Sequence, residues 1–140
     1  MQRILQGMKS LIALLLTLAL LPAHAARSIA LKKIDTVVGS GRLAMKGDTV
    51  VVQYGAWLFA PRQAGQRGAS FDTVSGNESF SFKLGAGSVI PGWEEGVPGM
   101  RVGGKRSLIV PASMAFGKTG NGPVPPGANL IFEIELLDVK

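Results

Sequence analysis

Hydrophobic and polar residues alternate with a period of two along most of the chain beyond its first 25 residues, which is typical of half-buried β-strands. The alternation is clearest in residues 49–58, TVVVQYGAWL, and in residues 130–137, LIFEIELL. It is shorter in residues 79–84, SFSFKL, and weaker in residues 105–111 and 28–38. Clusters of glycine, proline, asparagine and aspartate separate these segments. The pattern predicts four or five antiparallel strands with one polar face.

The other face of this predicted sheet is apolar and needs a cover. Its side chains are those of Val50, Val52, Tyr54, Ala56, Leu58, Phe80, Phe82, Leu84, Leu130, Phe132, Ile134 and Leu136. Only residues 91–99, PGWEEGVPG, carry helix signals that could supply the cover. Pro91 suits the first helical position, the two glutamates suit the N-terminal end of the helix dipole, and Gly96 predicts an early end. Trp93 is large enough to fill the hollow of a curled sheet.

The first 25 residues have a different organisation from the rest of the chain. Arg3 and Lys9 precede the apolar run Leu11–Leu21, and residues 22–25, PAHA, follow it. This is the three-part layout of a secretory signal peptide, and the run is shorter than the roughly 20 residues that a membrane-spanning helix needs. We therefore expect cleavage after Ala25, an exported protein without stable membrane insertion, and one domain at residues 26–140. The expected compartment is the periplasm if the source is a Gram-negative bacterium.

Composition excludes several kinds of chemistry. The chain has no cysteine and one histidine, His24, which leaves with the predicted signal peptide. The remaining domain therefore lacks Ser-His-Asp and Cys-His catalysis and the usual zinc ligand sets. Its basic residues are scattered surface charges, without the basic run and interleaved aromatics of a nucleic-acid surface. Residues 39–44, GSGRLA, lack the third glycine of a dinucleotide fingerprint. Any chemistry must come from carboxylates, hydroxyls, backbone groups or shape.

Several motifs occur in a fixed order between Val37 and Val139. They are YGAWLF, SFDT, FSFKLG, SVIPGWEEGVPGMRVGGKRSLIVP and AFGKTGNGPVPPGANLIFEIELLDV. In this order they resemble the FKBP-type peptidyl-prolyl cis-trans isomerase family. The resemblance implies an α+β fold, in which a curled antiparallel β-sheet of five or six strands wraps around one short α-helix. It also implies isomerase activity that requires no metal, nucleotide or covalent intermediate.

The resemblance further implies an apolar pocket between the sheet and the helix, with Trp93 as its floor. The residues it implies for catalysis are Tyr54, Phe71, Asp72, Ile90, Trp93 and Phe132. Those it implies for substrate binding are Phe80, Val89, Phe116 and Val124. The implied polar contacts are the backbone N–H of Ile90 and the carboxylate of Asp72, which either stabilises the rotated carbonyl or holds Tyr54 in place. The implied partners are proline-containing polypeptides and macrolide inhibitors, with no cofactor.

The sequence departs from the family pattern in two places. Phe116 stands where the family usually has a tyrosine, so a hydroxyl at the pocket rim is missing. Residues 55–70, GAWLFAPRQAGQRGAS, are longer than in the compact single-domain members and carry Arg62 and Arg67. We interpret them as a tolerated surface insertion, with contact to a partner as the alternative.

Two functions from different classes fit these residues. Rotation about an X-Pro bond makes and breaks no covalent bond, which suits a domain without histidine or cysteine. The alternative is a binding module or holdase chaperone that grips proline-containing segments with little turnover. Retention of all six residues implied for catalysis favours the isomerase.

Overall fold

The computed structural model describes residues 29–140, so the predicted signal peptide lies outside the described residues. The described chain consists of six β-strands, one short α-helix and two 3-10 turns. In chain order these are β1 (Lys32–Val37), β2 (Thr49–Phe59), η1 (Ala64–Gln66), β3 (Arg67–Val74), β4 (Phe80–Lys83), α2 (Pro91–Gly96), β5 (Lys105–Val110), η2 (Ala112–Met114) and β6 (Leu130–Val139). No helix within residues 29–140 has the length and apolar character needed to cross a membrane.

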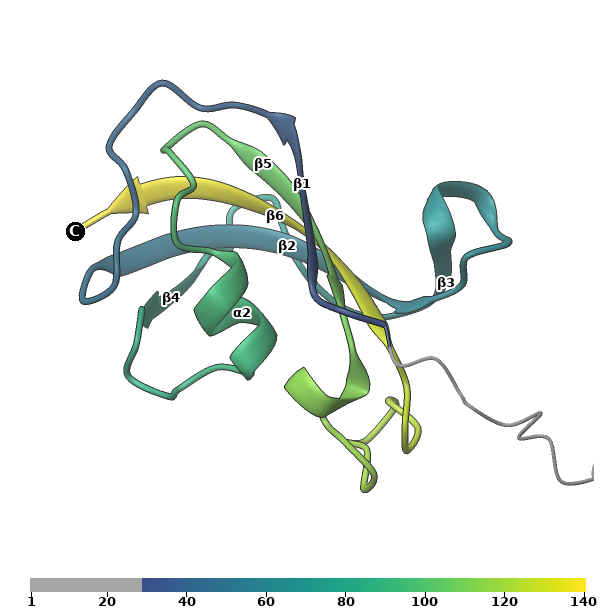
Figure 1. Cartoon of the computed structure of the whole chain (residues 1–140). Coiled ribbons are helices and arrows are strands. Elements are labelled where there is room, and N and C mark those ends of the chain that lie inside the picture. The colour runs from purple at the N-terminus through teal and green to yellow at the C-terminus, as the bar shows by residue number, and fades with distance from the viewer. Residues whose placement is uncertain (1–28) are drawn as a thin grey trace, which may run out of the picture.

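The six strands form one antiparallel sheet in the order β1-β5-β6-β2-β3, and β4 pairs with the first half of β2. The last strand, β6, therefore lies between β5 and β2. Figure 1 shows the sheet arching over α2, which lies beneath its concave side. The predicted fold class, a curled antiparallel sheet of five or six strands around one short helix, is confirmed.

The helix α2 packs directly against β5 through two glycines. It begins at Pro91, and its buried face consists of Gly92, Trp93 and Gly96. A Cβ atom at Gly92 would lie 2.4 Å from Cγ1 of Val110, and one at Gly96 would lie 2.6 Å from Cδ1 of Leu108. A larger residue at either glycine would therefore push the helix away from the sheet. The two glycines let Trp93 enter the core, where it is 4% exposed.

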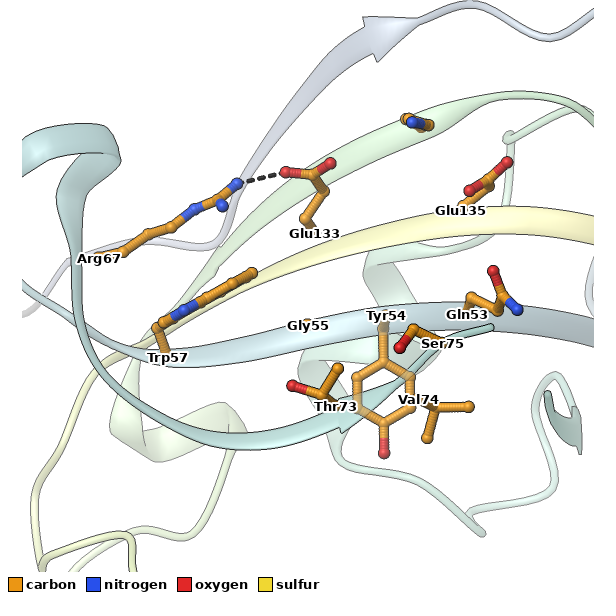
Figure 2. A pocket seen from close by; sticks show the side chains of 11 residues that line it. Gln53, Tyr54, Gly55, Trp57, Arg67, Thr73, Val74, Ser75, Glu133 and Glu135 are labelled. Atoms are coloured by element: carbon orange, nitrogen blue, oxygen red, sulfur yellow. Dashed lines mark hydrogen bonds and ion pairs between the residues drawn. The ribbon is translucent and has the colours of Figure 1, made fainter. Parts of the chain in front are cut away.

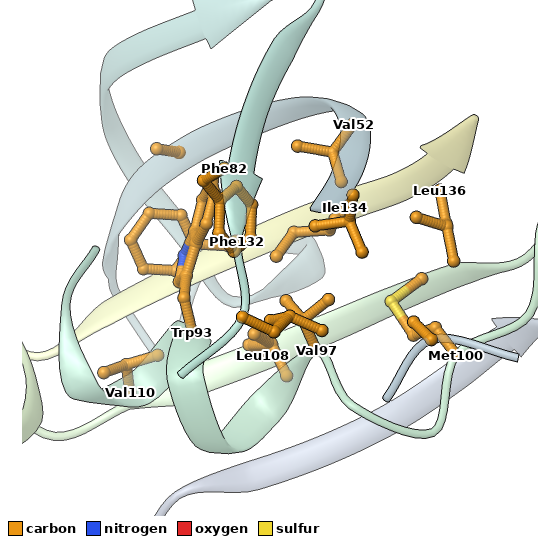
Figure 3. Close-up of a cluster of buried hydrophobic side chains, with 14 of the residues drawn as sticks. Val52, Phe82, Trp93, Val97, Met100, Leu108, Val110, Phe132, Ile134 and Leu136 are labelled. Carbon is orange, nitrogen blue, oxygen red and sulfur yellow. The ribbon is translucent and has the colours of Figure 1, made fainter. Parts of the chain in front are cut away.

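The hydrophobic core lies between the concave face of the sheet and α2. Figure 3 shows Trp93 and Val97 meeting side chains of β5 and β6 there. Its buried members include Val50, Val52, Ala56, Phe82, Leu84, Met100, Leu108, Val110, Leu130, Phe132, Ile134 and Leu136. The interpretation of Phe82 and Leu84 as core residues is confirmed, since they are 5% and 1% exposed.

The outer face of the sheet is not polar along its whole length. Ile109 of β5 and Ile131 of β6 pair with each other on that face, and each is 5% exposed. Residues 29–31 and Phe59 lie beside Ile109. The prediction of one polar face therefore holds for the part with Glu133 and Glu135 and is wrong at this second, smaller apolar cluster.

One basic side chain is buried rather than part of the dispersed surface charge. Arg106 is 8% exposed, and its Nε donates to Oδ1 of Asp35 on β1 at 2.7 Å. Its Nη1 donates to the carbonyl oxygens of Gly96 and Pro98, at 2.8 Å and 3.1 Å. Arg106 thus links the edge strand β1 to the end of α2. The hydrogen bond from Arg106 lowers the pKa of Asp35 below its ordinary value of 3.8.

Candidate active site

A pocket of about 380 Å³ opens between α2 and the concave face of the sheet. Its lining residues come from four strands, the helix and the segments that precede α2 and follow η2. They are Tyr54, Phe71, Asp72, Phe80, Gly87, Ser88, Val89, Ile90, Trp93, Phe116 and Phe132. All but one of the residues that the sequence predicts for this site are in this set.

The exception is Val124, which is 4% exposed and belongs to the hydrophobic core rather than the pocket lining. Its loop folds back on itself, because the N–H and C=O of Val124 pair with those of Asn121 at 2.9 Å each. Gly87 and Ser88 are lining residues that the sequence analysis missed. Small loop residues show no hydrophobic pattern, and the one available signal was their position directly before Val89.

Trp93 forms the floor of the pocket and is held there by other aromatic rings. The centroid of its ring lies 4.8 Å from that of Tyr54 and 5.4 Å from that of Phe132, at 85° and 84°. Phe82 packs against it from the core side at 5.5 Å. Edge-to-face pairs at such distances are the favoured geometry of aromatic side chains. The floor is therefore an apolar surface whose orientation is fixed from several sides.

A β-bulge brings Phe71 and Asp72 to the same pocket. Neighbouring residues of a regular strand point to opposite faces of the sheet. Here Ala56 of β2 pairs with Asp72, but the next residue, Trp57, pairs with Ser70. Phe71 is consequently an extra residue on β3, and an insertion of this kind re-aims side chains. The ring of Phe71 then meets that of Phe132 across the pocket, with centroids 6.2 Å apart.

The main polar interaction in the pocket joins β2 to this bulge. The hydroxyl of Tyr54 donates to Oδ2 of Asp72 at 2.6 Å. Burial raises the pKa of Tyr54 above its ordinary value of 10.0, and the neighbouring Asp72 carboxylate raises it further. Tyr54 therefore remains a protonated donor at neutral pH. The Asp72 side chain itself is solvent-exposed, so a carboxylate stands at the edge of an otherwise apolar wall.

The segment before α2 offers a backbone donor to the same pocket. Ile90 is the N-cap of the helix, and its carbonyl oxygen accepts from the N–H of Trp93 at 2.9 Å. The Ile90 N–H makes no backbone hydrogen bond within residues 29–140. Phe80, 37% exposed, stacks on Phe82 at the rim. Within the same residues, no group of three or more His, Cys, Asp or Glu side chains could hold a metal ion.

Comparison with known proteins gives consistent matches. The family model of FKBP-type peptidyl-prolyl cis-trans isomerases matches residues 40–137. An FK506-binding protein of Neisseria meningitidis is 42% identical over 107 residues, which cover 75% of this chain and 92% of that protein. FK506-binding protein 4 of Neurospora crassa is 44% identical over 106 residues, covering 76% of this chain and 21% of that protein.

The fold also matches solved structures. The crystal structure of FkpA from Escherichia coli has a TM-score of 0.67 and 34% sequence identity, and the match covers 85% of this chain and 54% of the FkpA chain. The chain thus spans almost the whole length of the Neisseria relative and only about a fifth of the Neurospora relative.

Proposed function

Because this chain belongs to the family of FKBP-type peptidyl-prolyl cis-trans isomerases, we propose that it accelerates rotation about X-Pro bonds in proline-containing polypeptides. The observation that carries the proposal is the pocket floored by Trp93 and walled by Tyr54, Phe71 and Phe132. Its relatives are named for FK506. Binding of macrolides of that kind in this pocket is part of the same proposal.

The reaction needs a site that favours a twisted amide. The barrier of roughly 20 kcal/mol arises because rotation removes the resonance between the amide nitrogen and the carbonyl group. An apolar site removes water from the polar planar amide and holds the prolyl ring while the carbonyl turns. Stabilisation of the twisted form relative to the planar form is what lowers the barrier. No proton or group is transferred.

We assign each part of the pocket a role in this rotation. The prolyl ring rests on Trp93 between Phe71 and Phe132, whose ring planes meet at 82°. The N–H of Ile90 donates to a carbonyl of the bound segment. Asp72 lies where its charge can act on the rotating carbonyl while its Oδ2 accepts from Tyr54. The hydroxyl of Tyr54 is the group that fixes the Asp72 side chain.

Export of the protein is a second proposal, and it is supported by residues 1–25 alone. Arg3 and Lys9, the apolar run and the PAHA ending have the layout of a secretory signal peptide. We expect the native protein to begin at Ala26 and to be exported, to the periplasm if the source is a Gram-negative bacterium. Mass spectrometry of protein purified from its own cells measures the N-terminus directly. Recovery of residues 1–25 still attached would contradict this proposal.

A proline-limited peptide assay tests the isomerase proposal. Uncatalysed exchange takes roughly 10–100 s at 25 °C, so acceleration is easily detected. We expect faster exchange with the protein present, and a preference for an apolar residue before proline because the pocket walls are aromatic. Phe71→Ala should lower the rate, whereas Lys118→Ala, at an exposed position outside the pocket lining, should leave it unchanged.

One result would move the assignment to the holdase alternative. A correctly folded protein that binds proline-containing peptides and leaves their exchange rate unchanged is a binding module rather than an isomerase. Peptide binding can be measured on the same samples by titration calorimetry.

A further inference from the structure

A cluster of three side chains lies on the outer face of the sheet, directly behind the pocket. Figure 2 shows Arg67 over Trp57, with its guanidinium joined to Glu133, while the ring of Tyr54 points to the opposite side of β2. The guanidinium carbon lies 4.0 Å from the centroid of the Trp57 ring. Nη2 of Arg67 donates to Oε2 of Glu133 and forms an ion pair with it. We call these three residues the back-face cluster.

The cluster joins three strands. Arg67 is the first residue of β3, Trp57 is on β2, and Glu133 is on β6, with β2 lying between the other two strands. Gly55 makes room for it, because a Cβ atom there would lie 2.3 Å from Cη2 of Trp57. The Trp57 ring can therefore lie along β2, and Arg67 can reach over it to Glu133.

The strand that the cluster holds is poorly fixed by its backbone. β3 is at the edge of the sheet and pairs only with β2. Its register shifts twice, between Ala56 and Trp57 and again between Trp57 and Phe59, whose partner is Arg67. Both irregularities fall in the half of β3 that leads to Phe71 and Asp72. An anchor at Arg67 would consequently constrain the segment that carries these two pocket residues.

Residues at the back-face cluster are sequence neighbours of residues that line the pocket. Glu133 follows Phe132, and Gly55 follows Tyr54, so each outer-face residue neighbours a pocket residue. Gly55 pairs with Glu133 on one side and with Thr73 on the other. The attachment point and the pocket wall are therefore opposite faces of the same short length of β2, β3 and β6.

We propose that Arg67 is a positioning residue for the pocket: by stacking on Trp57 and pairing with Glu133 it holds the bulged β3 so that Phe71 and Asp72 face the substrate. This inference rests on the proposed isomerase function. Arg67 is not among the residues that line the pocket, so it acts through β3. The interpretation of residues 55–70 as a surface insertion is therefore wrong for most of their length, because residues 55–59 belong to β2 and residues 67–70 belong to β3.

The decisive comparison is between Arg67→Ala and Arg42→Ala. Each variant removes one positive charge and one partly exposed ion pair, since Nη2 of Arg42 lies 3.7 Å from Oδ1 of Asp48, and neither residue is on β3. The Arg67 and Glu133 side chains are 34% and 36% exposed, and ion pairs that solvent reaches contribute little to stability. Both variants should therefore fold. We expect Arg67→Ala to lower kcat/KM by about three- to tenfold, below the roughly 100-fold that a 1 Å misplacement can cause.

Two further variants separate positioning from a general loss of stability. Arg67→Lys retains the charge but not the planar group that stacks on Trp57, so it should recover part of the lost kcat/KM. Glu133→Gln removes the ion pair but keeps the stacking on Trp57, so it should lower kcat/KM less than Arg67→Ala does. The double variant should be no worse than Arg67→Ala alone, because that change already removes both contacts of the guanidinium. High salt should bring the wild type toward the value of Arg67→Ala, since the pair is screened.

Two structural readouts do not depend on activity. NMR of the full chain should show faster amide exchange at Phe71 and Asp72 in Arg67→Ala than in Arg42→Ala. The 13Cζ shift of Tyr54, the single tyrosine of the chain, should move as its bond to Asp72 loosens. An inactive wild type would refute the proposed function while these shifts still test the role of Arg67. Equal exchange, equal 13Cζ shifts and equal kcat/KM in the Arg67 and Arg42 variants would overturn the inference.

Discussion

The Tyr54 hydroxyl and the Asp72 carboxylate are 2.6 Å apart, and their hydrogen bond spans β2 and the bulge of β3 on the pocket wall. Asp72 can serve the reaction by acting on the substrate carbonyl or by orienting Tyr54. The two roles depend on different groups. Action on the substrate needs only the Asp72 carboxylate at the edge of the pocket, whereas orientation of Tyr54 needs the hydrogen bond between the hydroxyl and the carboxylate.

Paired substitutions at this bond distinguish the two roles. If the carboxylate acts on the substrate, Asp72→Ala should lower kcat/KM by about ten- to 100-fold, because bonds to charged groups contribute roughly 1.5 to 3 kcal/mol. Tyr54→Phe keeps the carboxylate and should then cost only a few-fold. Both variants should retain most of their stability, since Asp72 is exposed. Equal losses of kcat/KM in the two variants, measured with one peptide, would assign Asp72 the orienting role.

Trp93 should matter for both folding and activity. Trp93→Ala removes a buried aromatic side chain and should lower the free energy of unfolding by about 3 to 5 kcal/mol. Trp93→Phe should cost less, because the indole N–H of Trp93 is buried without an acceptor among residues 29–140. Urea denaturation of the wild type, the two Trp93 variants and Asp72→Ala measures their free energies of unfolding. A destabilisation by Asp72→Ala as large as that by Trp93→Ala would make Asp72 a structural residue.

The Asp35–Arg106 pair predicts loss of stability at acid pH. The pKa of Asp35 in the folded protein is lowered from 3.8, first by the hydrogen bond from Arg106. The ionised carboxylate therefore stabilises the folded state above the ordinary pKa, and this stability is lost as the pH falls through the lowered pKa. Asp35→Asn should cost roughly 1 kcal/mol at neutral pH, because the Asp35 carboxylate is partly exposed and its pairing is screened by solvent.

Denaturation of the wild type and Asp35→Asn across the acid range measures this contribution. The two unfolding free energies should differ at neutral pH and converge at the lowest pH at which the protein still folds. A constant difference between the two proteins would show that Asp35 contributes through packing rather than through its charge.

A tyrosine in place of Phe116 should change macrolide affinity and turnover by different amounts. Phe116 lines the pocket, and a tyrosine there would add a hydroxyl at the rim. One neutral hydrogen bond contributes roughly 0.5 to 1.5 kcal/mol, which is a few-fold to about tenfold in affinity. Phe116→Tyr should therefore tighten macrolide binding more than it raises turnover, because rotation depends mainly on the apolar walls.

Titration calorimetry beside a peptide assay tests both parts of this prediction on one pair of proteins. Unchanged macrolide affinity would show that the rim hydroxyl has no ligand role in this pocket. A large rise in turnover would mean that the hydroxyl participates in the reaction.

The sequence pattern was sufficient to predict the regular parts of the fold. Alternation in residues 49–58 and 130–137 predicted β2 and β6, where long apolar side chains repeat on one face. Proline, the paired glutamates and Gly96 predicted the short α2 and the burial of Trp93. These signals come from residues that are close together in the sequence, so they can be recognised without knowledge of the tertiary structure.

The irregular parts could not be predicted in this way. β3 has the sequence RGASFDTV, whose small residues and bulge break the period of two. The pairing of Ile109 with Ile131 on the outer face and the burial of Arg106 depend on residues distant in sequence. The family resemblance placed Phe71 and Asp72 in the pocket. Only the shifted register between β2 and β3 explains how two neighbouring residues of one strand both line it.

The central position of β6 determines when this domain can fold during synthesis. Before residues 130–139 are made, β5 has only β1 as a partner and β2 has only β3 and β4. A growing chain therefore carries two separate pieces of sheet, each with its apolar face uncovered. Such surfaces attract chaperones and other nascent chains. The domain must consequently complete its fold after β6 has been synthesised, because no earlier strand can join the two pieces.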